Sequence, residues 1–268
     1  HTTAIRYLML YIIREECEKH IQRGYISYEN RRMLHKWHEL YHKDLGGNAN
    51  GYYVYYPTDA TDLTKVEQTW WWQLCHTEEF KLEANNSFSS STICNTWYGN
   101  TDVSGQDLSF INRVGKNQRG IDYNGDPEII LIFGGTNDFG HGDAPLGTIE
   151  DRSLYTFYGA CHHIMTRLHE RFAGKPIVFL TPLHRCNEDN PKGDGNKPYN
   201  VAPLKTYVNI IREMAEYYSL PVLDLYAVSG IQPKVDAIRE KYCPDGLHPN
   251  DAGYRRITDR LAAFLLAL

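Results

Sequence analysis

Short apolar runs alternate with amphipathic stretches along most of the chain after about residue 60. Runs of strand length, rich in Ile, Leu and Val, occupy residues 80–86, 128–134, 176–183 and 221–226. Around them, apolar residues recur every three or four positions and predict helices at 67–76, 105–114, 153–172, 202–218 and from 251 to the end. Buried strands that alternate with helices are typical of a parallel sheet covered on both faces. We therefore predict a three-layer α/β/α sandwich.

The first fifty residues have a different pattern. Apolar residues at helical spacing predict a helix over residues 3–23, with Gly24 at the position of a C-cap. Ser27 offers an N-cap for a second helix that ends at the pair Gly46 and Gly47. The pattern predicts a helical hairpin over residues 1–50, followed by a separate α/β domain over residues 53–268.

The first candidate for chemistry is the segment EIILIFGGTND, in which a buried strand runs directly into Gly134 and Gly135. Glycines allow the backbone to turn sharply and to approach a ligand closely. The side-chain amide of Asn137, just beyond them, could donate a hydrogen bond to a developing oxyanion. Asn137 and Asp138 after a strand are also ordinary turn residues, so this segment alone does not decide between the two interpretations.

The second candidate is CPDGLHPNDAGY, which precedes the last predicted helix. Asp245 and His248 lie three residues apart, so the carboxylate can bind one imidazole nitrogen and leave the other to act as a general base. Asn250 or Asp251 would cap the helix, and a purely structural cap is the alternative interpretation.

Composition restricts the class of partner. Hydrophobic residues make up 42% of the chain and charged residues 23%, as in an ordinary globular protein. The formal net charge of −5 argues against nucleic acid or an anionic membrane as the partner, and no apolar run reaches the length of a membrane span. The six cysteines contain no CxxC pair, which disfavours a zinc site, although their even number permits disulfides. His35, His38 and His42 share a predicted helix face, but no carboxylate or cysteine completes a metal site, so we predict neither a metal nor a cofactor.

The two candidate segments lie about 110 residues apart, and in this order they resemble the later sequence blocks of the SGNH (GDSL) hydrolases. This family of esterases and deacetylases has G-x-N-D and D-x-x-H-P in those blocks, and the resemblance covers residues 53–268. It implies that Asn137 is the side-chain oxyanion donor, that His248 is the base and that Asp245 orients it. The stretch from EQTWWWQL to ANNSFSSSTI also resembles the block that supplies a backbone oxyanion donor, which falls on Ser90, where the family has glycine.

The sequence block that carries the nucleophile in this family has no match in this chain. The nucleophile belongs to a Gly-Asp-Ser block at the end of the first strand, and no Gly-Asp-Ser occurs anywhere in this chain. The hairpin segment stands where that strand is expected, and it resembles small helical proteins of phage genomes over residues 4–50. A joined or recombined sequence would leave the sheet one strand short, with an unpaired inner edge. The serines that could substitute for the nucleophile are Ser87, Ser89, Ser90 and Ser91.

These observations support two hypotheses about function. The first is a serine-type carboxylic ester hydrolase that deacetylates a carbohydrate or another small ester, with Tyr55, Trp71 and Gly135 as substrate contacts. The tryptophan run at 70–72 can equally pack a helix onto the sheet. The second is a catalytically inactive binding module, associated with phage, that has lost its nucleophile block. The family resemblance suggests a secreted or periplasmic location, although the residues from His1 onward contain no signal sequence.

Overall fold

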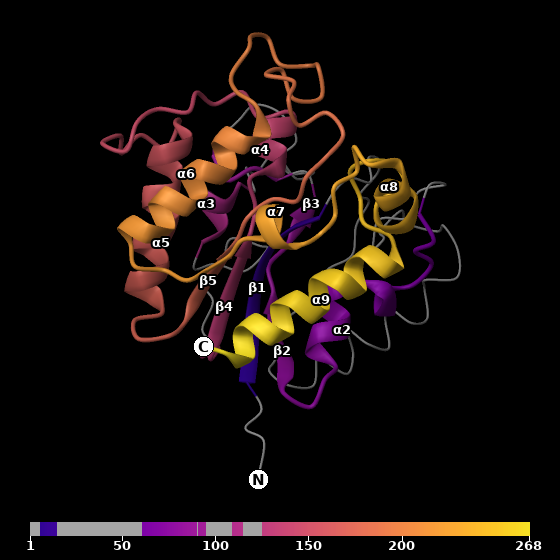
Figure 1. Ribbon diagram of the computed structural model, residues 1–268. Helices are drawn as coiled ribbons and strands as arrows, with labels where there is room; N and C mark the ends of the chain where they lie inside the picture. Colours follow the sequence, from indigo (N-terminus) through magenta and orange to yellow (C-terminus); the bar gives the residue numbers. More distant parts are fainter. Residues whose placement is uncertain (1–5, 15–60, 90, 95–108, 115–124) are drawn as a thin grey trace, which may run out of the picture.

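A single parallel sheet organises the part of the chain that the computed structural model describes, namely residues 6–14, 61–89, 91–94, 109–114 and 125–268. Its strands lie in the order β2–β1–β4–β5–β6, and every pairing is parallel (Figure 1). The bounds are β1 (Arg6–Arg14), β2 (Phe80–Asn85), β4 (Ile129–Phe133), β5 (Ile177–Leu180) and β6 (Val222–Leu223). A short strand, β3 (Phe88–Ser89), pairs with the end of β1. With β3 set aside, this is the order of the flavodoxin-like sheet.

The prediction of a helix over residues 3–23 is wrong for its described part, because Arg6–Arg14 forms β1. This strand pairs with β2 on one side, from Arg6 opposite Phe80, and with β4 on the other, from Leu8 opposite Ile129. A strand that is covered on both faces needs a nearly continuous apolar run, and such a run also contains helical spacings. The sheet therefore has its first strand and no vacant inner position between β2 and β4. The rest of the predicted hairpin lies outside the described residues.

Helices cover both faces of the sheet (Figure 1). On one face, α3 (Phe110–Arg113), α5 (Phe157–Arg171) and α6 (Leu204–Tyr217) form a core with the β4 side chains of Ile130 and Ile132. On the other face, α2 (Trp70–Cys75) and α9 (Asp251–Leu266) pack with Ile129 and Leu131. The side chains of β4 thus alternate between two cores, as a strand that is buried on both faces requires. The three-layer α/β/α sandwich is confirmed.

The strands and helices predicted after residue 60 are confirmed within the described residues, with shifts at their ends. Residues 105–108 of the helix predicted at 105–114 lie outside the described residues, and the strand predicted at 221–226 is limited to Val222–Leu223. Three short helices that we did not predict accompany them: α4 (Thr136–Gly140), α7 (Leu225–Val228) and α8 (Asp236–Tyr242). The 3₁₀ helix η1 (Val66–Gln68) lies at the start of the helix predicted at 67–76. Short helices escape a search for helical periodicity because they contain too few turns to show it. Among the described helices, none is both long enough and apolar enough to cross a membrane.

Candidate active site

The carboxyl ends of β1 and β4 mark the place where a ligand is expected in this topology. From β1 the chain continues to β2 on one side, and it later returns to β4 on the other side of β1. In open α/β sheets, ligands bind outside the carboxyl ends of the strands at such a switch point. Helix α4, which carries Asn137, follows β4 directly at this position.

A sharp turn connects β4 to α4. Gly135, the N-cap residue of α4, has φ of +103°, a conformation that residues with a side chain rarely adopt. A Cβ atom at Gly135 would also lie 3.0 Å from Cδ1 of Ile211 in α6. The turn brings Asn137 into a buried position, where its Nδ2 donates a hydrogen bond to the backbone oxygen of Ser91 at 3.1 Å. An amide nitrogen carries two hydrogens, so this bond orients the side chain while a second N–H remains for another acceptor.

Asp138 fixes the segment beside Asn137. Its carboxylate accepts hydrogen bonds from the backbone nitrogens of Ile93, at 2.8 Å, and Cys94, at 3.0 Å. Burial raises the pKa of Asp138 to about 6, although these two hydrogen bonds and the positive charge of Lys197 oppose the rise. Asn137 and Asp138 together therefore hold residues 91–94 against the end of β4.

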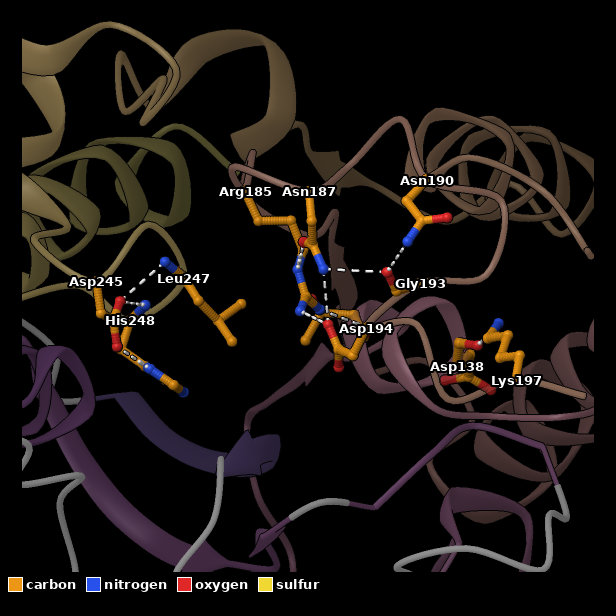
Figure 2. Close-up of polar contacts among 11 residues, drawn as sticks. Asp138, Arg185, Asn187, Asn190, Gly193, Asp194, Lys197, Asp245, Leu247 and His248 are labelled. Carbon is orange, nitrogen blue, oxygen red and sulfur yellow. Dashed lines mark hydrogen bonds and ion pairs between the residues drawn. The ribbon is translucent and has the colours of Figure 1, made fainter.

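The predicted pair of Asp245 and His248 is formed in the loop between α8 and α9 (Figure 2). Nδ1 of His248 donates to Oδ2 of Asp245, and Oδ1 of the same carboxylate accepts from the backbone nitrogens of His248, at 2.7 Å, and Leu247, at 2.9 Å. Burial acts to raise the pKa of Asp245, but the hydrogen bond and charge of His248 and the two backbone N–H groups lower it below its ordinary value. The carboxylate therefore stays ionised and fixes the imidazole with Nδ1 protonated, which leaves Nε2 as the basic nitrogen.

The helix cap predicted beside this pair is confirmed. The side chain of Asn250 accepts a hydrogen bond from the backbone nitrogen of Gly253 at 3.0 Å, and its own nitrogen donates to the backbone oxygen of Lys241. The cap thus ties the start of α9 to α8, so that the loop carrying Asp245 and His248 is fixed at both ends.

The serines near β2 differ in their surroundings. Ser91 is fully buried, and its Oγ accepts a hydrogen bond from Nη2 of Arg113 at 2.9 Å. The hydroxyl of Ser87 donates to Oδ1 of Asn85. The backbone of Ser89 pairs with Arg14, the last residue of β1, which places Ser89 beside the carboxyl end of the first strand. Ser90, predicted as the backbone oxyanion donor, lies outside the described residues.

Two of the three predicted substrate contacts, Trp71 and Gly135, lie in the described part of the chain. Tyr55 lies outside the described residues. Trp71 is partly buried and packs against the small core of Leu63 and Val66, while Gly135 forms the turn described above. The contact of Trp71 with a substrate stays a prediction, and its packing favours the structural interpretation.

Residues 184–200 are rich in Asn, Asp, Gly, Pro and Lys, a composition that predicts a surface loop able to shape specificity, but within them lie buried charged residues that the sequence did not reveal. Glu188 is 4% exposed and binds Nδ1 of His184 at 2.7 Å and Nζ of Lys234 at 3.0 Å. Arg185 and Lys197 are each 3% exposed and contact α4 (Figure 2). Burial lowers the pKa of Lys197 to about 8, against the charges of nearby carboxylates such as Asp138. A charged residue in a polar loop gives no sequence signal of burial until its partner is known.

Potential metal ligands do not cluster in the described part of the chain: no three His, Cys, Asp or Glu side chains there are arranged to hold an ion. The hydrogen-bonded pair of Asp245 and His248 has a geometry suited to acid-base chemistry, and the buried amide of Asn137 has one suited to hydrogen bonding to an anion.

Comparison with known proteins agrees with the fold of this chain. A family model for GDSL-like lipases and acylhydrolases matches residues 44–192, more than half of the chain. A solved protein from Lactobacillus plantarum is 27% identical, with a TM-score of 0.56, over 74% of this chain and 88% of its own. A GDSL-like lipase from Bacteroides ovatus is 23% identical, with a TM-score of 0.53, over 99% of this chain and 100% of its own. A GDSL-like lipase from Bacteroides uniformis is 24% identical, with a TM-score of 0.51, over 84% of this chain and 88% of its own. A search of curated proteins gave no match.

Proposed function

The chain belongs to the GDSL-like lipase and acylhydrolase family, and from that premise we propose that it is a serine-type carboxylic ester hydrolase. The observation that carries the proposal is the Asp245–His248 pair, which has an ionised carboxylate and a fixed tautomer. Asn137 supports it, because a buried amide donor lies at the end of β4, at the switch point of the sheet. A fold without catalysis needs neither a base held in one tautomer nor an amide held at this place.

In the proposed reaction, a serine hydroxyl attacks the ester carbonyl carbon and His248 Nε2 takes the hydroxyl proton. The carbonyl oxygen becomes an oxyanion, which the amide of Asn137 stabilises, and one such donor contributes about 2.7 to 4 kcal/mol. His248 then gives the proton to the departing alcohol as the acyl-enzyme forms. Water hydrolyses the acyl-enzyme by the same steps in reverse, releasing the acid and restoring the serine.

The substrate that we propose is a small ester, with an acetyl group on a carbohydrate as the first class to test. Two facts support this choice. The chain contains 20 tyrosines and 5 tryptophans, whose flat amphipathic rings suit sugar faces. Its formal net charge of −5 favours a neutral substrate over a polyanion.

The test is hydrolysis of p-nitrophenyl acetate by the unmodified chain, by His248→Ala and by the control His169→Ala, an exposed histidine on α5. We expect turnover by the unmodified chain and the control, and a loss of roughly 10²-fold or more in His248→Ala. Labelling with a fluorophosphonate followed by peptide mapping identifies the serine. Equal rates in all three proteins, with no labelled serine, would refute the proposal.

One observation favours a second candidate function, a binding module without turnover. No Gly-Asp-Ser block occurs in the sequence, so the nucleophile of the family is not in its usual motif. This candidate predicts no fluorophosphonate adduct and no turnover, together with saturable binding of an acetylated sugar in calorimetry. His248→Ala would then change affinity rather than rate.

A further inference from the structure

Residues 185–197 follow β5 and lie against α4, the helix that carries Asn137 (Figure 2). Nη1 of Arg185 donates to the backbone oxygen and to Oγ1 of Thr136, both at 3.3 Å. Nζ of Lys197 donates to the backbone oxygen of Asp138 at 2.7 Å. The backbone nitrogen of Asp194 donates to the oxygen of Gly140 at 2.8 Å. The segment therefore binds the first, third and fifth residues of α4.

A helix this short does not hold its own position. Helices of fewer than about 12 residues are marginal in water, so packing and external hydrogen bonds must fix α4, which has 5 residues. Packing here is close: a Cβ atom on Gly193 would lie 2.1 Å from the backbone oxygen of Phe139, so no side chain fits between the segment and the helix. The guanidinium carbon of Arg185 also lies over the Phe139 ring, 5.1 Å from its centre.

Polar contacts within the segment fix the side chain of Arg185. Its Nη2 forms an ion pair with Oδ1 of Asp194, and its Nε donates to Oδ1 of Asn187 at 2.8 Å. Nδ2 of Asn187 donates to the backbone oxygen of Gly193 at 3.1 Å and to Oδ1 of Asp194 at 2.8 Å, both within the same segment. The planar guanidinium thus joins both ends of the loop to Thr136, an arrangement that the single ammonium group of lysine cannot reproduce.

The neighbouring residue contacts the other half of the proposed site. The backbone nitrogen of Cys186 donates to the backbone oxygen of Gly246 at 2.9 Å. Gly246 lies between Asp245 and His248, in the loop that holds the base. Arg185 therefore binds the helix that carries Asn137, and Cys186 binds the loop that carries His248. The distance between this helix and this loop decides whether the base and the oxyanion donor can act on one substrate.

We propose that segment 185–197 sets the position of Asn137 relative to His248, and that Arg185 is the positioning residue through which it acts. The inference rests on the proposed function, because it takes Asn137 as the oxyanion donor. A displacement of about 1 Å in a catalytic group can reduce the rate by about 10²-fold. Arg185 therefore acts on the rate of the chemical step through Asn137, without contact to the substrate.

The test is a double-mutant cycle of Arg185→Met and Asn137→Ala. The kcat for p-nitrophenyl acetate is expressed per active site titrated with fluorophosphonate, so that unfolded protein does not count. We expect Arg185→Met alone to lower kcat roughly 10- to 100-fold with little change in KM. In the Asn137→Ala background, the same substitution should change kcat by less than about 2-fold, because the group that it positions is already gone.

Arg167→Met is the matched control, since Arg167 is an exposed arginine on α5 whose side chain is 53% exposed. A loss of kcat that is equally large in both backgrounds would overturn the inference, because it would show that Arg185 acts independently of Asn137. If the unmodified chain has no turnover, the proposed function fails, and amide hydrogen exchange then decides the inference. Faster exchange at residues 136–142 in Arg185→Met, but not in Arg167→Met, supports positioning, and unchanged exchange there overturns it.

Discussion

Replacing Glu188 with glutamine should remove about 3 kcal/mol from the free energy of unfolding at pH 7. Burial acts to raise the pKa of this carboxyl, but hydrogen bonds from His184 and Lys234 and their charges lower it from 4.5 to about 2. The difference of about 2.5 pKa units corresponds to about 3 kcal/mol at 1.36 kcal/mol per unit. Because the side chain is only 6% exposed, solvent screens this contribution little.

The sign of the pH dependence follows from linkage. The native state of the protein holds Glu188 ionised down to pH about 2, whereas the unfolded chain takes up the proton near pH 4.5. The stabilisation is therefore complete above pH 4.5 and is lost as the pH falls toward 2. The difference in stability between the unmodified protein and Glu188→Gln should shrink as the pH falls from about 4.5 toward 2.

The assay is urea denaturation followed by tryptophan fluorescence between pH 7 and 3. Glu170→Gln is the control, because Glu170 forms an exposed ion pair with Arg167 and should contribute less than about 1 kcal/mol. A Glu188→Gln protein within about 0.5 kcal/mol of the unmodified protein at pH 7 would refute the reasoning, since surface substitutions without such partners have effects of that size. A difference that does not change with pH would refute the assignment to ionisation.

Three further predictions concern the site. Asn137→Ala should lower kcat roughly 10²- to 10³-fold with little change in KM, measured with a chromogenic acetate; a change confined to KM would contradict a role in the transition state. Gly135→Ala should destabilise the protein by about 1 to 2 kcal/mol in thermal unfolding, because φ is +103° and the new methyl group meets Ile211 at 3.0 Å. The pKa of Asp138 is raised from 3.8 to about 6, so ionisation of this carboxyl makes the free energy of unfolding fall as the pH rises between these values. Asp138→Asn should remove this pH dependence. If the free energy of unfolding, measured by denaturation, changes equally with pH in both proteins, the prediction is contradicted.

The sequence predicted the parts of the site that follow from local chemistry. The apolar run before Gly134 and the Asp245–His248 spacing each specify a local structure, and the structure has a strand and a hydrogen-bonded pair at these places. The order of the two segments also identified the family, which the family model confirms.

Two features could not be predicted because they depend on distant partners. The run at Arg6–Arg14 fits a buried strand or a helix equally well, and only its pairing with Phe80–Asn85 and Ile129–Phe133 selects the strand. Arg185 and Lys197 look like solvated charges in a polar loop, and their burial follows from the acceptors of α4. Contacts between residues so far apart in the sequence leave no periodic pattern of apolar and polar residues from which they could be predicted.

The place of β1 in the middle of the sheet has a consequence for how the protein folds. Ile129, which pairs opposite Leu8, lies 121 positions later in the chain, so synthesis at about 5 to 20 residues per second delivers β4 roughly 6 to 24 s after β1. During that interval β1 lacks at least one of its two partner strands, so at least one of its long edges is open to other chains. Pairings between strands so far apart in sequence also form slowly once the chain is complete. Folding yield should therefore fall steeply with protein concentration, and a chaperone that shields the early strand should restore it.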